Sequence, residues 1–348
     1  MSQNIREEYF HRKYEESLSI EVTNRCNSAC SHCFVRAAVS KPSDLSINLF
    51  NEIMFEGYQL GYRHLHITGG EPLLWKGLHE AIDDAFCMGY KSVFMNSNGT
   101  LLSKDFIRRL SGHDGFSISV SLEGPQPLHD KVRGHGSYRQ TERGIRKALE
   151  AGMDLCIFTT VTQSLLAALP RFIDDLYEKL PKIKHFSLIQ LIRVKDDVFD
   201  LADELLDPKD FLELVRMVLR LNTYGHKTEV LNNPLAVVVS RIFGIPLIPP
   251  VLPLCRPGHL IVTADGNIAL AHSAPHRFGT YKPGMIEKVL SSQAYRMAVG
   301  RDKTLCPSCA HAELCKENGM LGPSEWYRDM HPAIPFCKRV LDKALSCV

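Results

Sequence analysis

Three cysteines lie close together near the N-terminus, at Cys26, Cys30 and Cys33. Clustered soft thiolates on one loop are typical ligands of an iron–sulfur cluster. A cubane [4Fe–4S] cluster has four irons, so three thiolates leave one iron open to a further ligand, which serves chemistry rather than structure. A structural zinc ion is the alternative, but it requires four ligands, and His32 lies awkwardly between two of the cysteines. The loop therefore favours a cluster over zinc.

The spacing of this triad, with three and then two residues between successive cysteines, resembles that of the radical S-adenosylmethionine (SAM) enzymes. In that family SAM binds the open iron, and an electron from the cluster cleaves its sulfonium. The 5′-deoxyadenosyl radical that is released abstracts hydrogen from the substrate. The resemblance implies a [4Fe–4S] cluster and SAM as cofactors, and it places His32 among the cofactor-binding residues.

Further motifs follow later strands in the order of the same family. Gly69 and Gly70 permit a close backbone approach, and Glu71, which precedes Pro72, can hold an ammonium group. The resemblance assigns this turn, Gly69–Pro72, to the methionyl amino group of SAM. It implies further SAM contacts from Ser97, Asn98, Ser121, Glu123 and Arg133. Glu123 is a departure, because the family usually has Asp there.

Strands and helices alternate from about residue 17, and these elements must position the motifs. Six strand–helix units in order predict a parallel sheet with right-handed crossovers. A closed barrel needs eight units, so we expect an α/β fold with a partial (β/α)6 TIM-like barrel. The motifs lie at the C-terminal ends of the strands, where such folds carry their chemistry. The expected strands are 18–23, 64–68, 92–96, 116–122, 155–161 and 186–192, and the expected helices include 46–60, 77–89, 138–152 and 169–180.

The alternation stops at about residue 200. We expect a helix at 208–223, an apolar segment at 234–255 that begins with a short helix at 234–243, and a hairpin at 259–270. Arg241 and five prolines within the apolar segment argue against a membrane span. The expected domains are a radical SAM core at 1–200, a helical and apolar connection at 201–254, and an auxiliary cluster domain at 255–348.

A second set of four thiolates lies in the C-terminal tail, at Cys306, Cys309, Cys315 and Cys337. Taken alone, this set suits zinc as well as a cluster. Beside a radical SAM core it resembles the SPASM domain, which implies one fully ligated auxiliary [4Fe–4S] cluster. Ala271 and Gly319 stand where that family's full pattern has cysteines, so we expect the site of another auxiliary cluster to be eroded.

The eroded site leaves Cys255 and His272 as candidate catalytic residues. Either side chain can donate or accept a proton or a hydrogen atom near the active site. The plainer interpretations are a small buried residue for Cys255 and a surface histidine for His272.

Composition bounds the function class. Among 348 residues 45% are hydrophobic and 23% charged, as in ordinary soluble proteins, and a net charge of +2 argues against a nucleic-acid partner. The N-terminal segment is charged and does not resemble a signal peptide. We therefore expect the eleven cysteines to serve metal binding or redox chemistry in the cytoplasm.

We therefore expect a cytoplasmic, oxygen-sensitive radical SAM enzyme that modifies a peptide or protein side chain. The expected partners are the substrate, a reductase or a flavodoxin or ferredoxin as electron donor, and a separate peptide-carrier protein, with no membrane. One alternative is a dehydrogenase or epimerase acting on a carbohydrate-type small molecule. A remoter alternative is a non-catalytic zinc-binding interaction protein.

Overall fold

The computed structural model describes residues 16–33, 35, 41–191, 201–231, 233–245, 247, 257–270, 277–299, 309–317 and 336–346. The chain divides into two compact units. One unit comprises Met1–Ser121, Arg139–Leu155 and Cys255–Gly300, and the other comprises Leu122–Tyr138, Cys156–Leu254 and Arg301–Val348.

A mainly parallel sheet forms the first unit. Four parallel strands follow one another in chain order: β1 (Ser17–Thr23), β2 (His64–Gly69), β3 (Ser92–Ser97) and β4 (Phe116–Ser121). On the other side of β1 lies β8 (Leu260–Val262), which is parallel to it, followed by the antiparallel strands β9 (Asn267–Ala269) and β10 (Arg277–Thr280). The segment near residue 260 thus extends the sheet that begins at the N-terminus.

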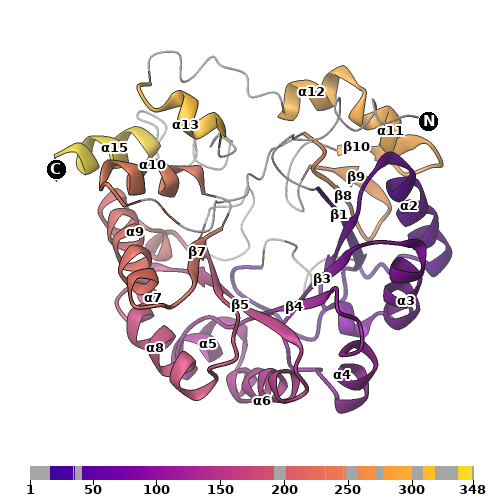
Figure 1. Ribbon diagram of the computed structural model, residues 1–348, viewed down its shortest axis with the longest axis horizontal. Coiled ribbons are helices and arrows are strands. Elements are labelled where there is room, and N and C mark those ends of the chain that lie inside the picture. The colour runs from indigo at the N-terminus through magenta and orange to yellow at the C-terminus, as the bar shows by residue number, and fades with distance from the viewer. Residues whose placement is uncertain are drawn as a thin grey trace. The chain divides into compact units, whose positions relative to one another are not determined.

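The two faces of this sheet differ in chemistry. Ile20, Ile67, Met95 and Ile118 are neighbours in register, and all four are fully buried. The adjacent row on the opposite face is Ser19, His66, Phe94 and Ser117. Helices α2 (Ile47–Leu60), α3 (Leu78–Met88) and α4 (Lys104–Leu110) lie together on one side of these strands in Figure 1. The apolar rows form a helix–sheet core and leave a more polar inner face.

Local capping explains where these helices begin and end. The side chains of Ser46 and Ser103 accept hydrogen bonds from the first turns of α2 and α4. Helix α2 ends at Gly61, whose φ of 111° lies in the left-handed region that favours glycine. A short 3-10 helix, η1 (Pro72–Leu74), follows β2, and most of α6 (Ser137–Glu150) also belongs to this unit.

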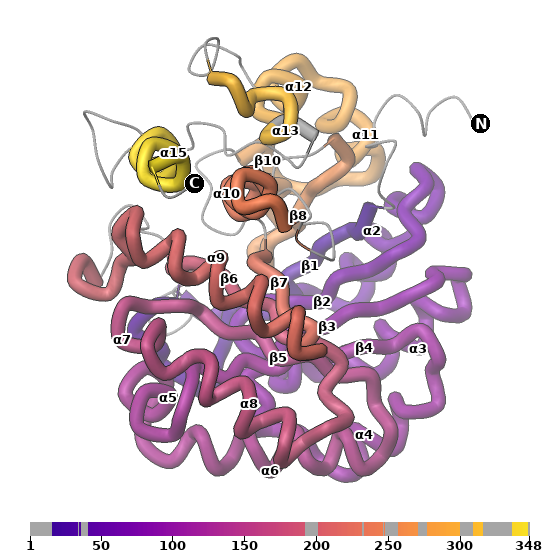
Figure 2. The backbone as a smooth tube through the Cα atoms, turned by 60° about the vertical axis from the view of Figure 1, so that its left-hand side comes forward, coloured from indigo at the N-terminus to yellow at the C-terminus, as the bar shows by residue number. Residues whose placement is uncertain are grey.

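The second unit has three parallel strands in the order β5 (Asp154–Val161), β6 (Phe186–Gln190) and β7 (Thr228–Val230). The first two residues of β5, Asp154 and Leu155, belong to the first unit. Its helices are α5 (Gln126–Arg133), α7 (Gln163–Leu166), α8 (Leu169–Lys179), η2 (Ala202–Glu204), α9 (Pro208–Thr223), α10 (Pro234–Ile242), α13 (Ala312–Glu317) and α15 (Phe336–Leu345). Helix α15 packs on α9, where the rings of Phe211 and Phe336 meet edge to face, and α13 and α15 both contact α10 (Figure 2). The C-terminal tail is thereby joined to the helices of this unit.

The expected strands and helices are confirmed with small shifts at their ends, and the hairpin at 259–270 is confirmed as β8 and β9. The expectation that the alternation stops at about residue 200 was wrong, because α9 leads into β7, which pairs with β6. With only three residues, β7 is too short for its periodicity to be detected. The division at residues 200 and 254 stays a prediction, and the compact units group the segments after residue 254 differently.

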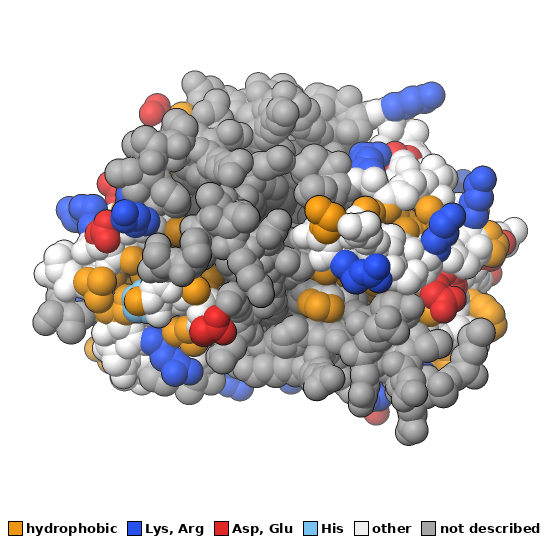
Figure 3. All heavy atoms as spheres, turned by 90° about the horizontal axis from the view of Figure 1, so that it is seen from above, with side chains coloured by type: hydrophobic (Ala, Val, Ile, Leu, Met, Phe, Trp, Pro, Cys, Tyr) orange, Lys and Arg blue, Asp and Glu red, His pale blue; other side chains and the backbone are white. Residues whose placement is uncertain are grey.

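The described surface carries charges of both signs. Lys and Arg are interspersed with Asp and Glu on the described part of the face in Figure 3. Among the described residues, no helix combines the length and the apolar character that crossing a membrane requires.

Glu56 of α2 anchors the segment that follows β10. Its carboxylate accepts hydrogen bonds from the Tyr281 hydroxyl at 2.8 Å and from the backbone N–H groups of Gly284 and Ile286 at 3.0 and 2.8 Å. Helix α11 (Met285–Leu290) begins at these donors, and α12 (Gln293–Val299) follows it. Burial, together with the hydrogen bond to Glu56 and its negative charge, raises the pKa of Tyr281. One side chain thus ties α11 to the sheet's helical layer.

We predict that Glu56→Gln destabilises the protein by about 1–3 kcal/mol, because the amide cannot accept all of these hydrogen bonds. Hydrogen exchange at residues 284–287 should accelerate, and urea unfolding should give the free energy. The control is Glu150→Gln, at an exposed residue at the end of α6, which should change the free energy by less than about 0.5 kcal/mol. Equal effects of the two substitutions would contradict the anchoring role.

Candidate functional site

The predicted cluster ligands lie on the loop that follows β1. Cys30 is buried, and Cys26 and Cys33 are half-buried. A turn joins the last two, since the Cys33 N–H donates to the Cys30 carbonyl at 3.2 Å. The structure places the three cysteines on one short segment. Across the described residues, however, no three His, Cys, Asp or Glu side chains are gathered closely enough to hold a metal ion.

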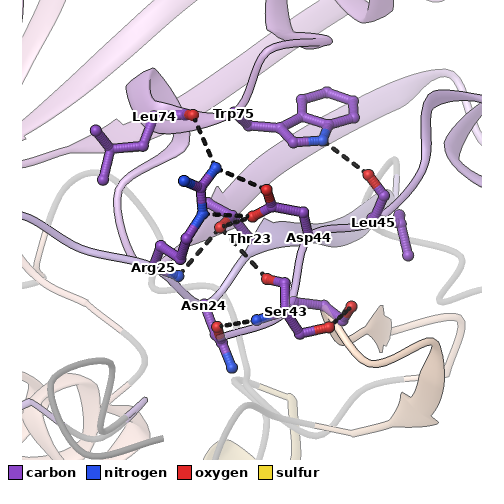
Figure 4. A network of polar contacts seen from close by, with 9 residues as sticks. Thr23, Asn24, Arg25, Ser43, Asp44, Leu45, Leu74 and Trp75 are labelled. Atoms are coloured by element: carbon purple, nitrogen blue, oxygen red, sulfur yellow. Dashed lines mark hydrogen bonds and ion pairs between the residues drawn. The ribbon is translucent and has the colours of Figure 1, made fainter. Parts of the chain in front are cut away.

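Hydrogen bonds close the base of this loop (Figure 4). The Asn24 N–H donates to the Ser43 carbonyl at 3.0 Å, and the Ser43 N–H donates to Asn24 Oδ1 at 2.7 Å. Thr23 and Asp44 form an antiparallel bridge, and the Thr23 hydroxyl donates to Asp44 Oδ1 at 2.5 Å. The residues before and after the cysteine segment are therefore held side by side.

An ion pair strengthens the closure. Arg25 Nε and Nη2 donate to the two carboxylate oxygens of Asp44 at 2.9 and 2.6 Å, and Nη2 also donates to the Leu74 carbonyl at 3.2 Å. Burial disfavours the charged form of Asp44, but the hydrogen bonds from Arg25 and Thr23 and the positive charge of Arg25 outweigh it. The pKa of Asp44 is consequently held below its usual value of 3.8.

The glycines of the turn after β2 permit a close contact with the cysteine loop. The N–H of Gly70 donates to the Thr23 carbonyl at 2.7 Å, and the N–H of Glu71 donates to the Arg25 carbonyl at 2.8 Å. A Cβ at Gly69 would lie 2.1 Å from the Thr23 oxygen, and one at Gly70 would lie 2.2 Å from the Arg25 oxygen. Both positions need glycine because two backbones touch there, immediately before Cys26.

Glu71 is fully buried and binds groups of this chain. Its Oε1 accepts hydrogen bonds from Ser97 Oγ at 2.9 Å and the Leu73 N–H at 3.2 Å, and its Oε2 accepts one from the Asn98 N–H at 2.7 Å. Buried Pro72 opens the 3-10 helix that follows. Three of the residues predicted to contact SAM, namely Glu71, Ser97 and Asn98, are thus brought together as one network that links the ends of β2 and β3. Their contact with SAM stays a prediction.

Two polar atoms face the inner side of the same sheet. Asn96 and Ser119 are opposite each other in register on β3 and β4. The Asn96 Oδ1 and Ser119 Oγ atoms are buried and make no hydrogen bond among the described residues. Buried polar atoms in native proteins nearly always have a partner, so a ligand or an ordered water is expected there. The sequence singled out neither side chain, because the strand alternation gives only the face and not the partners.

In the second unit, Glu123 and Arg133 bind each other. Glu123 is 3% exposed, its Oε1 accepts from Arg133 Nε and Nη2 at 3.0 and 2.5 Å, and its Oε2 accepts from the Thr160 N–H at 2.7 Å. The Glu123 N–H donates to His129 Nδ1 at 3.0 Å. Ser121, half-buried at the end of β4, belongs to the first unit. The predicted roles of these residues toward SAM are not tested.

Some of the remaining predicted site residues lie in segments that the structure describes, and others lie outside them. Cys309 precedes α13, Cys315 lies within it, and Cys337 lies in α15, so two helices that contact α10 carry cysteines. Cys306, Cys255 and His272 lie outside the described residues, so their predicted roles are not addressed. Half-buried His32 lies within the cysteine loop.

Sequence reasoning missed the residues that hold the loop. Arg25 and Asp44 are distant in sequence, and no motif joins them. Asn27 and Thr100 connect the loop to the end of β3 by a hydrogen bond of 2.8 Å. The available signal was the unusual density of Asn, Ser and Thr beside the cysteines and at 96–100, which indicates side chains that bind backbone groups.

We predict that Gly70→Ala destabilises the protein by about 1–3 kcal/mol, because the added methyl group forces two backbones apart. Hydrogen exchange at residues 23–33 should accelerate locally. Gly112→Ala is the matched control, since a Cβ there meets no atom within 4 Å. Slow exchange at 23–33 in the Gly70 variant would refute the close-contact interpretation.

A second prediction concerns pH. Because folding lowers the pKa of Asp44, its charge stabilises the protein above pH 3.8, and this contribution is lost as the pH falls through the folded-state pKa. The difference in unfolding free energy between the wild type and Asp44→Asn should therefore be greatest at about pH 7 and should shrink at acidic pH. Asp105→Asn, which removes a carboxylate from an exposed ion pair of α4, is the control for the loss of a surface charge. A difference for Asp44→Asn that does not vary with pH would contradict the prediction.

Comparison with known proteins agrees with these motifs. Residues 20–164 match the model of the radical SAM superfamily. The AdoMet-dependent heme synthase of Nitratidesulfovibrio vulgaris is 33% identical over 149 residues, which are 42% of this chain and 40% of that protein. The sporulation killing factor maturation protein SkfB of Bacillus subtilis is 28% identical over 149 residues, 42% of this chain and 36% of its own. The matches thus span about two fifths of the lengths of these relatives.

The fold resembles solved structures over nearly its whole length. The structure of native anSMEcpe with bound AdoMet and Cp18Cys peptide has a TM-score of 0.71 at 16% identity, and the match covers 95% of this chain and 96% of that one. This likeness confirms the expected α/β fold with an open, partial TIM-like barrel. The auxiliary cluster domain within that expectation stays a prediction. Residues 20–164 thus match the radical SAM superfamily model, and the chain shares the open, partial-barrel fold of the solved structure.

Proposed function

We propose that this protein is a radical SAM enzyme that modifies a peptide or protein side chain. Cys26, Cys30 and Cys33 would hold a [4Fe–4S] cluster whose open iron binds SAM. When bound, these cofactors supply the electron and the 5′-deoxyadenosyl radical with which hydrogen is abstracted from the substrate.

The observation that carries the proposal is the contact between the cysteine loop and the Gly-Gly-Glu turn. Hydrogen bonds from Gly70 and Glu71 to the backbone at Thr23 and Arg25 hold the turn against the residue before Cys26. The family motifs are thus joined in space as well as in order along the chain. The donor chemistry also fits a thiolate, since the Ser28 N–H lies 3.4 Å and Asn98 Nδ2 3.9 Å from Cys26 Sγ.

The chain's own residues would bind and orient the cofactors. The closed base of the loop fixes where the thiols lie, and burial of Cys30 restricts its contact with water. The Glu71 network fixes the loops after β2 and β3 before a ligand arrives, so little ordering remains when SAM binds. In the second unit, the carboxylate of Glu123 orients the Arg133 guanidinium, which would meet the SAM carboxylate.

Relatives support more than one substrate class. SkfB is named as a maturation protein, and anSMEcpe was solved with a bound peptide, which favours a peptide or protein substrate. The relative at 33% identity is named as a heme synthase, so a small-molecule substrate is the second candidate. None of these names points to the carbohydrate-type substrate that we considered from the sequence.

Further parts of the proposal concern the tail and the partners. Cys306, Cys309, Cys315 and Cys337 would hold one auxiliary [4Fe–4S] cluster in a SPASM-like domain. The enzyme would be cytoplasmic and oxygen-sensitive, receive electrons from a reductase or from a flavodoxin or ferredoxin, and meet a peptide substrate directly or through a carrier protein. Cys255 and His272 remain the candidates for moving a proton or a hydrogen atom.

Anaerobic reconstitution tests the cofactor assignment. Two clusters predict about eight irons per chain, and replacement of Cys26, Cys30 and Cys33 by Ala should leave about four irons and abolish SAM cleavage to 5′-deoxyadenosine. The control is Cys87→Ala, at an exposed cysteine of α3, which should keep both properties. Zinc in place of iron, or SAM cleavage by the triple variant, would refute the assignment.

The substrate class can be tested without knowing the substrate. The reconstituted enzyme is incubated with SAM, a reductant and an extract of deuterated source cells, separated by size into a macromolecular and a small-molecule fraction. We expect deuterium in 5′-deoxyadenosine only with the fraction of peptides and proteins, because hydrogen abstraction transfers the label from the substrate. Label that comes only from the small-molecule fraction would overturn the peptide assignment in favour of the second candidate.

A further inference from the structure

Three side chains close a ring of hydrogen bonds beside Cys26. Asn27 Nδ2 donates to Thr100 Oγ1 at 2.8 Å, Thr100 Oγ1 donates to Asn98 Oδ1 at 2.7 Å, and Asn98 Nδ2 donates to Asn27 Oδ1 at 2.8 Å. Each residue donates once and accepts once around this Asn27–Thr100–Asn98 ring. Because hydrogen bonds in such a chain polarise one another, the ring is held more strongly than three separate contacts would be.

One member of the ring is fixed in the core of the first unit. Asn98 is 6% exposed, its N–H donates to Glu71 Oε2 at 2.7 Å, and its carbonyl accepts from Thr141 Oγ1 at 2.9 Å. Asn27, in contrast, is exposed on the cysteine loop. Through the ring, buried Asn98 therefore holds exposed Asn27 in place, and Asn27 directly follows Cys26, a predicted cluster ligand.

The amide that closes the ring also lies against the sulfur. Asn98 Nδ2 is 3.9 Å from Cys26 Sγ and 3.5 Å from Ser28 Oγ. The Ser28 N–H, one residue beyond Asn27, donates to the same sulfur at 3.4 Å. If the path of residues 27 and 28 changed, both donors would leave the sulfur.

We propose that the Asn27–Thr100–Asn98 ring is a positioning device for Cys26. It fixes the backbone on the C-terminal side of this cysteine and keeps two N–H donors at its sulfur. The inference rests on the proposed function, in which Cys26 is a cluster ligand. Hydrogen bonds to a ligating sulfur stabilise the reduced, more electron-rich state, so the ring should raise the reduction potential of the bound cluster.

Thr100 is the member of the ring whose replacement isolates its effect. Thr100→Val removes the hydroxyl that both donates and accepts, nearly preserves the side-chain volume, and leaves Asn98 anchored to Glu71 and Thr141. Thr100→Ser keeps the hydroxyl and should restore the ring. A matched control is Thr223→Val in the second unit, which removes a hydroxyl that donates to the Leu219 carbonyl at 2.9 Å.

The first measurement uses the protein without cofactors. We expect hydrogen exchange over residues 24–33 to be about tenfold faster in Thr100→Val, with wild-type rates in Thr100→Ser and Thr223→Val. Unchanged exchange over this segment would overturn the proposal. Equally accelerated exchange across β4 would also overturn it, because the substitution would then have loosened the whole sheet.

The second measurement uses the iron-loaded protein. We expect a more negative midpoint potential and an altered electron paramagnetic resonance spectrum for the cluster in Thr100→Val, both restored in Thr100→Ser. An unchanged potential and spectrum would show that the ring does not act on Cys26. If the wild type binds no iron at all, the proposed function fails, whereas the exchange experiment still tests whether the ring orders the loop.

Discussion

Hydrogen bonds and an ion pair at the base of the cysteine loop hold the residues before and after the cysteines side by side. Asn24 and Ser43 exchange hydrogen bonds, and the Arg25–Asp44 ion pair lies across the same two strands of chain. Closing a loop costs conformational entropy, and contacts at the base offset this cost without involving the cysteines themselves. Charged and polar neighbours on either side thereby set the position of the segment that carries the cysteines.

Four carboxylates of this structure each accept several hydrogen bonds. Asp44 closes the loop base, Glu71 joins the ends of β2 and β3, Glu123 holds Arg133, and Glu56 anchors α11. For Glu71 and Glu123, which are buried, these hydrogen bonds compensate for the cost of removing the charge from water. Removing one of the four carboxylates would leave several donors unsatisfied, so these positions should tolerate substitution less well than their surface neighbours.

The hydrogen bonds that these carboxylates already accept affect how SAM would bind. The sequence motif suggested that Glu71 and Arg133 are available for the charged groups of SAM, but in the structure both are held by groups of this chain. A ligand at these positions would have to share or exchange these partners. Asn96 and Ser119 differ from them, because their buried polar atoms make no hydrogen bond among the described residues.

Most strands and helices of this protein could be predicted from the sequence, as could its resemblance to a family. Apolar periodicity predicted the strands from β1 to β6, and the cysteine spacing with the Gly-Gly-Glu-Pro turn predicted the resemblance to the radical SAM superfamily, whose model matches residues 20–164. Both signals lie within short stretches of chain. The three-residue β7, the pairing of β8 with β1, the Arg25–Asp44 closure and the Asn27–Thr100–Asn98 ring were decided only by the tertiary structure. Strand β7 is too short to show a period in the sequence. The other three features are contacts between residues far apart in the chain, and such contacts leave no local sequence pattern. The hydrogen-bond partners of these polar side chains can therefore be known only from the tertiary structure.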